Sequence, residues 1–175
     1  EPSGDVWITL DLDAHVQAGE DLESTEEYGV VLAASMAHAM IRDNHAVGLI
    51  AYGKEPSIIR PQKGQLQLWE ILRVLAGVHA VSEYSLGQVI SLIEPVVGRG
   101  MSMAIVTPST NPEWIRTVGQ MLRHGIHVTT LLLDARTFGG EGETRGVVSA
   151  LADLGVAAHT IGQGFTFDII TERRK

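Results

Sequence analysis

The chain has 175 residues and no cysteine, which excludes disulfides, thiolate metal sites and cysteine nucleophiles. It has only three lysines, Lys54, Lys63 and Lys175, and a formal net charge of −8. Because phosphate binding needs clustered Lys and Arg, this charge argues against a nucleic-acid partner. No apolar stretch reaches the roughly 18 residues of a membrane helix. Phosphate-binding glycine loops and the Gly-x-Ser-x-Gly elbow are also missing.

The composition that remains is that of a globular protein with a real core. Apolar residues make up 45% of the chain and charged residues 19%, which fits one domain over residues 1–175. The sequence starts Glu-Pro-Ser-Gly, without Met, so we expect a fragment of a longer protein. We expect a cytoplasmic domain, or one held at the cytoplasmic face of the membrane by a segment outside this chain.

Strand and helix patterns alternate along the sequence. Apolar runs predict strands over residues 5–12, 45–52, 101–107, 126–134 and 156–161, with an edge strand over 57–60 bracketed by prolines. A further strand or an extended tail is expected over 165–170. The order predicts an α/β fold, a Rossmann-like three-layer sandwich with a mostly parallel central sheet and one antiparallel edge strand.

The helices between these strands have recognisable start signals and apolar faces. Ser24 and Glu27 have the spacing of a capping box, and Asn111-Pro112 has the pattern of a helix start. Helices are expected over residues 65–78, 86–97 and 146–154, and after both start signals. In the 65–78 helix the inward positions are predicted to be Leu66, Trp69, Leu72, Leu75 and Ala76.

Polar residues follow the first strand at the point where it ends. Asp11, Asp13 and His15 stand at i, i+2 and i+4, and ligands of open parallel sheets bind beyond the carboxyl ends of the strands. Thr107, after a later strand, would lie beside Asp11 if the two strands are neighbours. These residue types suit a hard cation. The alternative is that Asp13 and His15 only polarise a loop and help to cap the next helix.

Five segments occur in an order typical of a known family: Val6-Trp7-Ile8-Thr9-Leu10-Asp11-Leu12-Asp13, Glu23-Ser24-Thr25-Glu26-Glu27-Tyr28, Ala33-Ala34-Ser35-Met36-Ala37, Val47-Gly48-Leu49-Ile50-Ala51-Tyr52-Gly53 and Gly64-Gln65-Leu66. Through these segments the chain resembles von Willebrand factor A-type domains of the bacterial family called domain of unknown function fifty-eight. The resemblance covers nearly the whole chain. It implies a binding role rather than catalysis, and association with a MoxR-type AAA+ ATPase.

The chain departs from the family's metal-ion-dependent adhesion site (MIDAS), which has Asp-x-Ser-x-Ser, a middle Thr and a distal Asp. Asp13 and His15 replace the two serines, and Thr107-Pro108 stands where the distal Asp is expected. Ser82 or Ser85 would have to substitute for the Thr. The usual site leaves one coordination position of the metal for an acidic residue of the partner. Asp13 adds negative charge beside that position and disfavours an incoming carboxylate. We therefore expect a degenerate site at Asp11, Asp13, His15 and Thr107, with at most a weakly bound divalent cation.

The rival class is a haloacid-dehalogenase-like, Mg²⁺-dependent phosphatase. Asp11 would be its nucleophile, Asp13 its general acid/base, and Thr107 the hydroxyl that holds the phosphoryl group. That mechanism also needs a later lysine to balance phosphoryl charge, and no lysine occurs between Thr107 and Ile170. It needs a downstream acidic pair as well, whereas Asp134 stands alone after its strand. The binding module is therefore the preferred hypothesis.

Overall fold

A six-stranded sheet organises the molecule. The computed structural model describes residues 4–166, and the tail expected over 165–170 therefore lies mostly outside the described residues. The strand order is β5-β4-β1-β6-β7-β8, with β5 antiparallel to β4 and all other pairings parallel. The expected α/β architecture and its antiparallel edge strand are confirmed. The strands are β1 (Val6–Leu10), β4 (Val47–Tyr52), β5 (Pro56–Gln62), β6 (Ser102–Thr107), β7 (His127–Leu133) and β8 (Ala157–Ile161).

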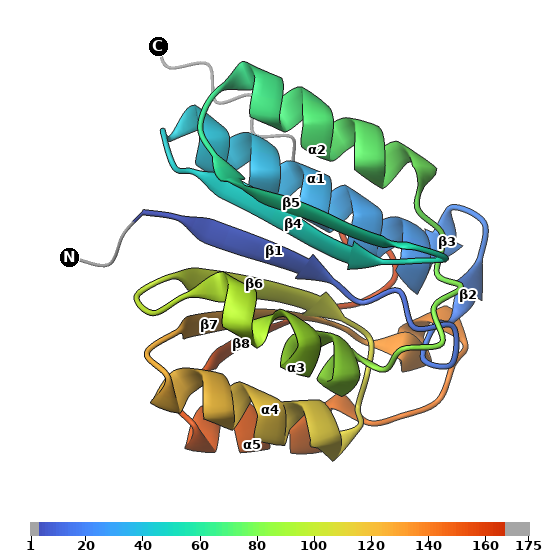
Figure 1. Cartoon of the computed structure of the whole chain (residues 1–175). Coiled ribbons are helices and arrows are strands. Elements are labelled where there is room, and N and C mark those ends of the chain that lie inside the picture. The colour runs from blue at the N-terminus through green and yellow to red at the C-terminus, as the bar shows by residue number, and fades with distance from the viewer. Residues whose placement is uncertain (1–3, 167–175) are drawn as a thin grey trace, which may run out of the picture.

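Helices cover both faces of this sheet, giving three layers (Figure 1). One face carries α1 (Thr25–Arg42) and α2 (Gln65–Gly77). The other carries α3 (Leu86–Val97), α4 (Pro112–Arg123) and α5 (Thr144–Asp153). Each face has its own apolar cluster, which explains why the central strands are apolar on both sides. No helix within residues 4–166 is long and apolar enough to cross a membrane.

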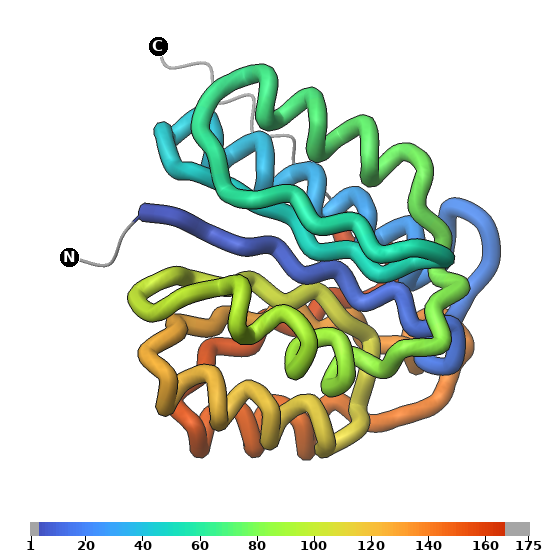
Figure 2. The backbone as a smooth tube through the Cα atoms, viewed as in Figure 1, coloured from blue at the N-terminus to red at the C-terminus, as the bar shows by residue number. Residues whose placement is uncertain are grey.

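The loops after β1, β4, β6 and β7 gather at one edge of the sheet, at the right of Figure 2. Because parallel strands end at the same edge, this carboxyl edge is where the candidate residues must lie. A small hairpin, β2 (Gly19–Glu20) with β3 (Glu23–Ser24), projects there before α1. A 3-10 turn, η1 (Ala135–Phe138), follows β7.

The helix start signals are largely confirmed, with one correction. The Ser24 hydroxyl oxygen accepts from the Glu27 N–H at 3.1 Å, and Asn111 caps α4 in the same manner. In the part of the chain described, no return bond joins the Glu27 side chain to Ser24, so the expected reciprocal box is wrong. The Ser24 hydroxyl donates to the Asp21 carbonyl oxygen instead, at 2.8 Å. The reciprocal box occurs at Ser85 and Gln88, before α3.

The orientation of α2 also differs from the prediction. Leu66 is 85% exposed and Trp69 63% exposed, whereas Gln67 is buried beside Leu68. The cause lies in the neighbouring strands, whose register is irregular where β4 pairs with β5. The Gln67 amide Nε2 donates to the Val47 and Arg60 carbonyl oxygens, at 2.7 and 2.9 Å. Because buried carbonyls need partners, Gln67 faces the sheet and its apolar neighbours Leu66 and Trp69 turn outward.

Candidate functional site

Asp11 and Thr107 meet at the carboxyl edge because their strands are neighbours. Strands β1 and β6 run parallel with Leu10 opposite Val106, so the next residue of each chain segment emerges at the same level. The Thr107 hydroxyl donates to Asp11 Oδ2 at 2.6 Å. The Ser109 N–H donates in turn to Thr107 Oγ1 at 2.9 Å. The sheet therefore fixes this pair, and the following turn fixes the hydroxyl.

The other oxygen of Asp11 is also engaged. Oδ1 accepts the Asp13 N–H at 3.0 Å. The carboxyl group is buried, and this burial raises the pKa of Asp11 from 3.8 to about 6, against the lowering effect of the hydrogen bonds from Thr107 and Asp13. The negative charge of Asp13 also raises this pKa. Both carboxylate oxygens are thus used inside the protein.

Asp13 and His15 form a second local unit. Asp13 Oδ1 accepts the His15 N–H at 2.9 Å and lies 2.9 Å from His15 Nδ1. The imidazole is 70% exposed, while the Asp13 side chain is buried. The hydrogen bond to Asp13, followed by the charge of Asp13, raises the pKa of His15 above its ordinary value. The exposed His15 therefore contacts one oxygen of the buried Asp13 carboxylate, Oδ1, through both its main-chain N–H and its ring.

Gln17 is a structural member of this site that the sequence did not reveal. Its Nε2 donates to the carbonyl oxygens of Asp11 and Asp13, at 3.1 and 3.2 Å. Its Oε1 accepts the Thr25 hydroxyl at 2.7 Å, which ties the loop to the start of α1. No periodicity or motif marks such a loop glutamine, because its partners are main-chain groups set by the fold.

The other candidates have separate places. Ser82 forms a parallel bridge with Asp13, but its hydroxyl oxygen accepts the Tyr84 N–H. Ser85 caps α3. Asp134 caps η1, accepting the Arg136 N–H at 3.2 Å. None of these three side chains has a hydrogen bond to Asp11 within residues 4–166.

The residues present do not fit the metal that the family's site implies. Mg²⁺ demands a near-octahedral shell of oxygen ligands, whereas both oxygens of Asp11 already accept hydrogen bonds. Among the described residues, no three Asp, Glu or His side chains are placed to share an ion. A phosphatase nucleophile would likewise need an unengaged carboxylate oxygen directed at the substrate. Both oxygens of Asp11 and one oxygen of Asp13 are thus hydrogen-bonded within the cluster.

A shallow cavity of about 390 Å³ lies beside the cluster. Its lining includes His15, Gln17, Ser109, Asn111 and Glu141. The hairpin of β2 and β3 adds exposed carboxylates nearby, at Glu20, Asp21 and Glu23. The carboxyl edge therefore presents a polar, acidic surface around a buried hydrogen-bonded centre.

Comparison with known proteins agrees with this fold. Residues 1–132 match the family described as "Protein of unknown function DUF58", and the chain belongs to that family, the one it resembles in sequence. BatB from Bacteroides thetaiotaomicron is similar in structure, with a TM-score of 0.67, 17% identity, and coverage of 91% of this chain and 90% of that one. No curated protein matches significantly.

Two further structures share the fold at lower coverage of their own length. An aerotolerance-related membrane protein from Bacteroides fragilis has a TM-score of 0.56 and 19% identity, over 73% of this chain and 66% of that one. The pilus adhesin SpaC from Lactobacillus rhamnosus has a TM-score of 0.60 and 9% identity, over 89% of this chain and 27% of that one. At these identities the likeness shows the three-layer fold alone.

Proposed function

We propose that this member of the DUF58 family is a non-enzymatic protein-interaction module whose carboxyl edge is a degenerate MIDAS. The observation that carries the proposal is the internal use of both Asp11 oxygens, by the Thr107 hydroxyl and the Asp13 N–H. An adhesion-type metal site needs such oxygens for the ion. Here the same positions stabilise the loop, so binding to a partner would not require a metal bridge.

The partner proposed is a MoxR-type AAA+ ATPase that docks over the loops of the carboxyl edge. Glu20, Asp21 and Glu23 are exposed there, and Leu22 at the hairpin tip is 74% exposed. Acidic groups around an apolar tip favour a basic surface with an apolar depression. Charge complementarity would set the approach, and burial of Leu22 would add affinity.

The interaction is tested by titrating the purified domain with the MoxR-type ATPase of the same organism, without nucleotide, in Mg²⁺ and in EDTA. We expect equal affinity in both buffers. Reversing two charges of the hairpin, Glu20→Lys with Glu23→Lys, should weaken binding about tenfold. Asp43→Lys with Asp153→Lys is the matched control, since both are exposed acids away from the hairpin. Loss of binding in EDTA would contradict a metal-independent edge.

Metal binding is tested separately by isothermal titration with Mg²⁺, Mn²⁺ and Zn²⁺. We expect no Mg²⁺ binding at micromolar concentration, and at most weak binding of a softer ion through His15. Micromolar Mg²⁺ affinity that disappears in Asp11→Ala would show an intact site. A colorimetric phosphatase assay covers the rival class, and Mg²⁺-dependent turnover abolished by Asp11→Asn would replace the binding proposal with catalysis.

A further inference from the structure

The outward side of α2 together with β5, here called the α2–β5 face, exposes apolar side chains that a solvated surface does not need. Leu66 is 85% exposed and Trp69 63%. Leu66, Trp69 and Arg73 recur at spacings of three and four, so they form one stripe along α2. Trp and Arg are the residue types most enriched where partners gain binding energy.

The segment that forms this face is basic, in an acidic molecule. Residues 54–79 contain four cations and two carboxylates, a formal charge of +2, whereas the chain as a whole carries −8. Lys54 has no ion pair among the described residues, and Arg73 shares its guanidinium only with the exposed Glu70, at 2.6 Å. The four cations are Lys54, Arg60, Lys63 and Arg73.

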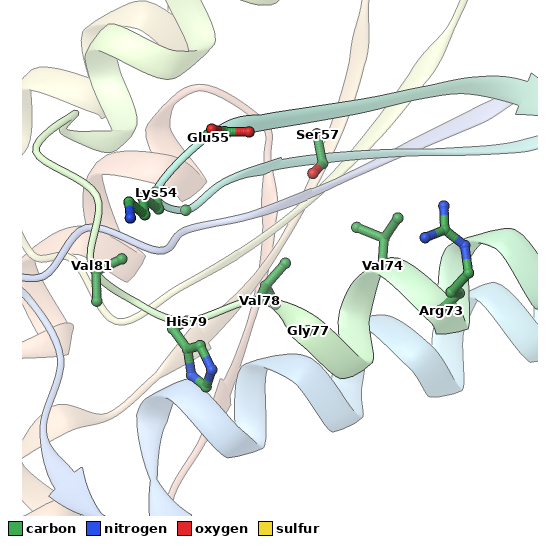
Figure 3. Close-up of a pocket in the computed structure, with 10 residues that line it drawn as sticks. Lys54, Glu55, Ser57, Arg73, Val74, Gly77, Val78, His79 and Val81 are labelled. Atoms are coloured by element: carbon green, nitrogen blue, oxygen red, sulfur yellow. The ribbon is translucent and has the colours of Figure 1, made fainter.

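A cavity of about 650 Å³ continues the stripe toward the carboxyl end of α2 (Figure 3). Val74 of α2 and Val78, the residue after α2, point toward Ser57 of β5, and Val81 lies on the segment that follows. Lys54 stands at one end of this cavity and Arg73 at the other. The cavity thus combines three valines with cations at its ends, and Glu55 next to Lys54 also lines it. This lining suits an apolar side chain, with carboxylates of the ligand directed at Lys54 and Arg73.

We propose that the α2–β5 face docks an acidic amphipathic helix of a partner protein. The helix lies along α2, placing one apolar side chain in the cavity beside Val74 and others over Leu66 and Trp69. Its carboxylates meet Lys54, Lys63 and Arg73. Since α2 has 13 residues, or about 20 Å at 1.5 Å per residue, the occupant needs about three to four turns.

A helix fits this face better than an added strand or a bilayer. Pro56 is the first residue of β5 and Pro61 lies within it, and proline on an edge strand opposes pairing with another strand. The Arg60 carbonyl oxygen is already taken by Gln67. A bilayer has no side chain to fill the cavity lined by Val74 and Val78, whereas a peptide does.

The test uses Trp69 as its own reporter, because Trp7 and Trp114 are buried. The probe is a stapled helical peptide of about four turns with Leu at every third or fourth position and Glu elsewhere. We expect binding to shift the Trp69 emission to the blue and to protect it from acrylamide. Trp69→Phe should abolish the signal while a labelled peptide still binds. A peptide with Lys in place of Glu should bind at least about tenfold more weakly.

Charge-reversal variants locate the contact. Lys54→Glu with Arg73→Glu should weaken the acidic peptide about tenfold, with an unchanged melting temperature. Arg136→Glu with Arg145→Glu makes the same charge change at exposed residues of η1 and α5 and should leave binding unchanged. The proposal is overturned if the acidic peptide does not bind, or if both peptides bind equally. It is also overturned if phosphatidylglycerol vesicles protect Trp69 from acrylamide and the peptide does not. The same holds if Trp69 is protected only because the domain self-associates.

Discussion

The carboxyl edge and the α2–β5 face differ in the burial of their candidate binding residues. At the edge, Asp11 and Thr107 are buried and bonded to each other at 2.6 Å. On the α2–β5 face, Leu66 and Trp69 are exposed, and Lys54 has no ion pair in the described part of the chain. The motif that attracts attention in the sequence is internally satisfied, and the unsatisfied surface lies where the sequence predicted core.

This contrast shows how polar residues at the carboxyl edge of a sheet can be hydrogen-bonded without a ligand. A buried carboxylate must find donors within the protein or bind a cation. Here the Thr107 hydroxyl and the Asp13 N–H supply those donors. Exposed apolar side chains such as Leu66 and Trp69 are not buried within the protein, so contact with a partner would remove their apolar surface from water.

The largest expected effect is on the free energy of unfolding. It comes from comparing a leucine-to-alanine substitution on the buried side of α2 with the same substitution on its exposed side. Leu68 is 3% exposed and Leu66 85% exposed. Leu68→Ala should cost about 2–5 kcal/mol in the free energy of unfolding, because it leaves a cavity under α2. Leu66→Ala should stay within about 0.5 kcal/mol. Denaturant unfolding of both variants checks this, and equal losses would mean that α2 does not face the sheet as described.

Burial of the Asp11 carboxyl at the carboxyl edge should make the stability of the protein depend on pH. The folded pKa of Asp11 is about 6 and its ordinary value 3.8, so the folded state binds the proton more tightly than the unfolded chain. The ionised group therefore costs stability above pH 6, and the cost is relieved as pH falls toward 3.8. A shift of this size corresponds to about 3 kcal/mol.

Asp11→Asn removes this titration while keeping a side chain of the same shape. The stability of the variant relative to the wild type should therefore rise with pH between about 4 and 6, then level off. Loss of hydrogen bonds would offset the whole curve without changing its slope. Urea titrations at closely spaced pH values measure the difference. A flat difference across this range would show that Asp11 is not desolvated.

Sequence patterns alone predict much of the fold and part of the site. Alternation identified the strands, and the neighbouring of β1 and β6 was enough to bring Asp11 and Thr107 together. These features depend on local periodicity and on the common direction of parallel strands. Leu10, Val106 and Leu132 lie in the apolar runs that predicted these strands, and all three are buried.

The errors occur where tertiary contacts override the local pattern. Leu66 and Trp69 have helical periodicity, but the irregular pairing of β4 with β5 directs Gln67 inward to two carbonyl groups. Gln17 is similar, because it binds main-chain oxygens of a loop whose course depends on the fold. Neither the irregular strand pairing nor the loop course is encoded in a short window of sequence.

The next prediction compares the stability contributions of two buried threonine hydroxyls, one that donates a hydrogen bond and one that does not. Thr107→Val removes the donor to Asp11 and leaves a buried acceptor unpaired, which should cost about 1–3 kcal/mol. Thr130 on the adjacent strand β7 is also buried, but its hydroxyl has no hydrogen-bond partner within residues 4–166. Thr130→Val should therefore be neutral or stabilising. Thermal melts of the two variants compare them directly, and similar losses would argue against a special role for the Thr107 hydroxyl.

The smallest expected effect concerns whether Asp13 is held by His15 or is free for a ligand. The hydrogen bond and the charge of Asp13 raise the pKa of His15, so protonated His15 is favoured in the folded state. This stabilisation is present at low pH and is lost as pH rises through the folded pKa. NMR titration of the His15 ring should give a midpoint above 6.5, the ordinary histidine value. Asp13→Asn should lower that midpoint because it removes the carboxylate. A midpoint unchanged by Asp13→Asn would show that the carboxylate does not hold the imidazole.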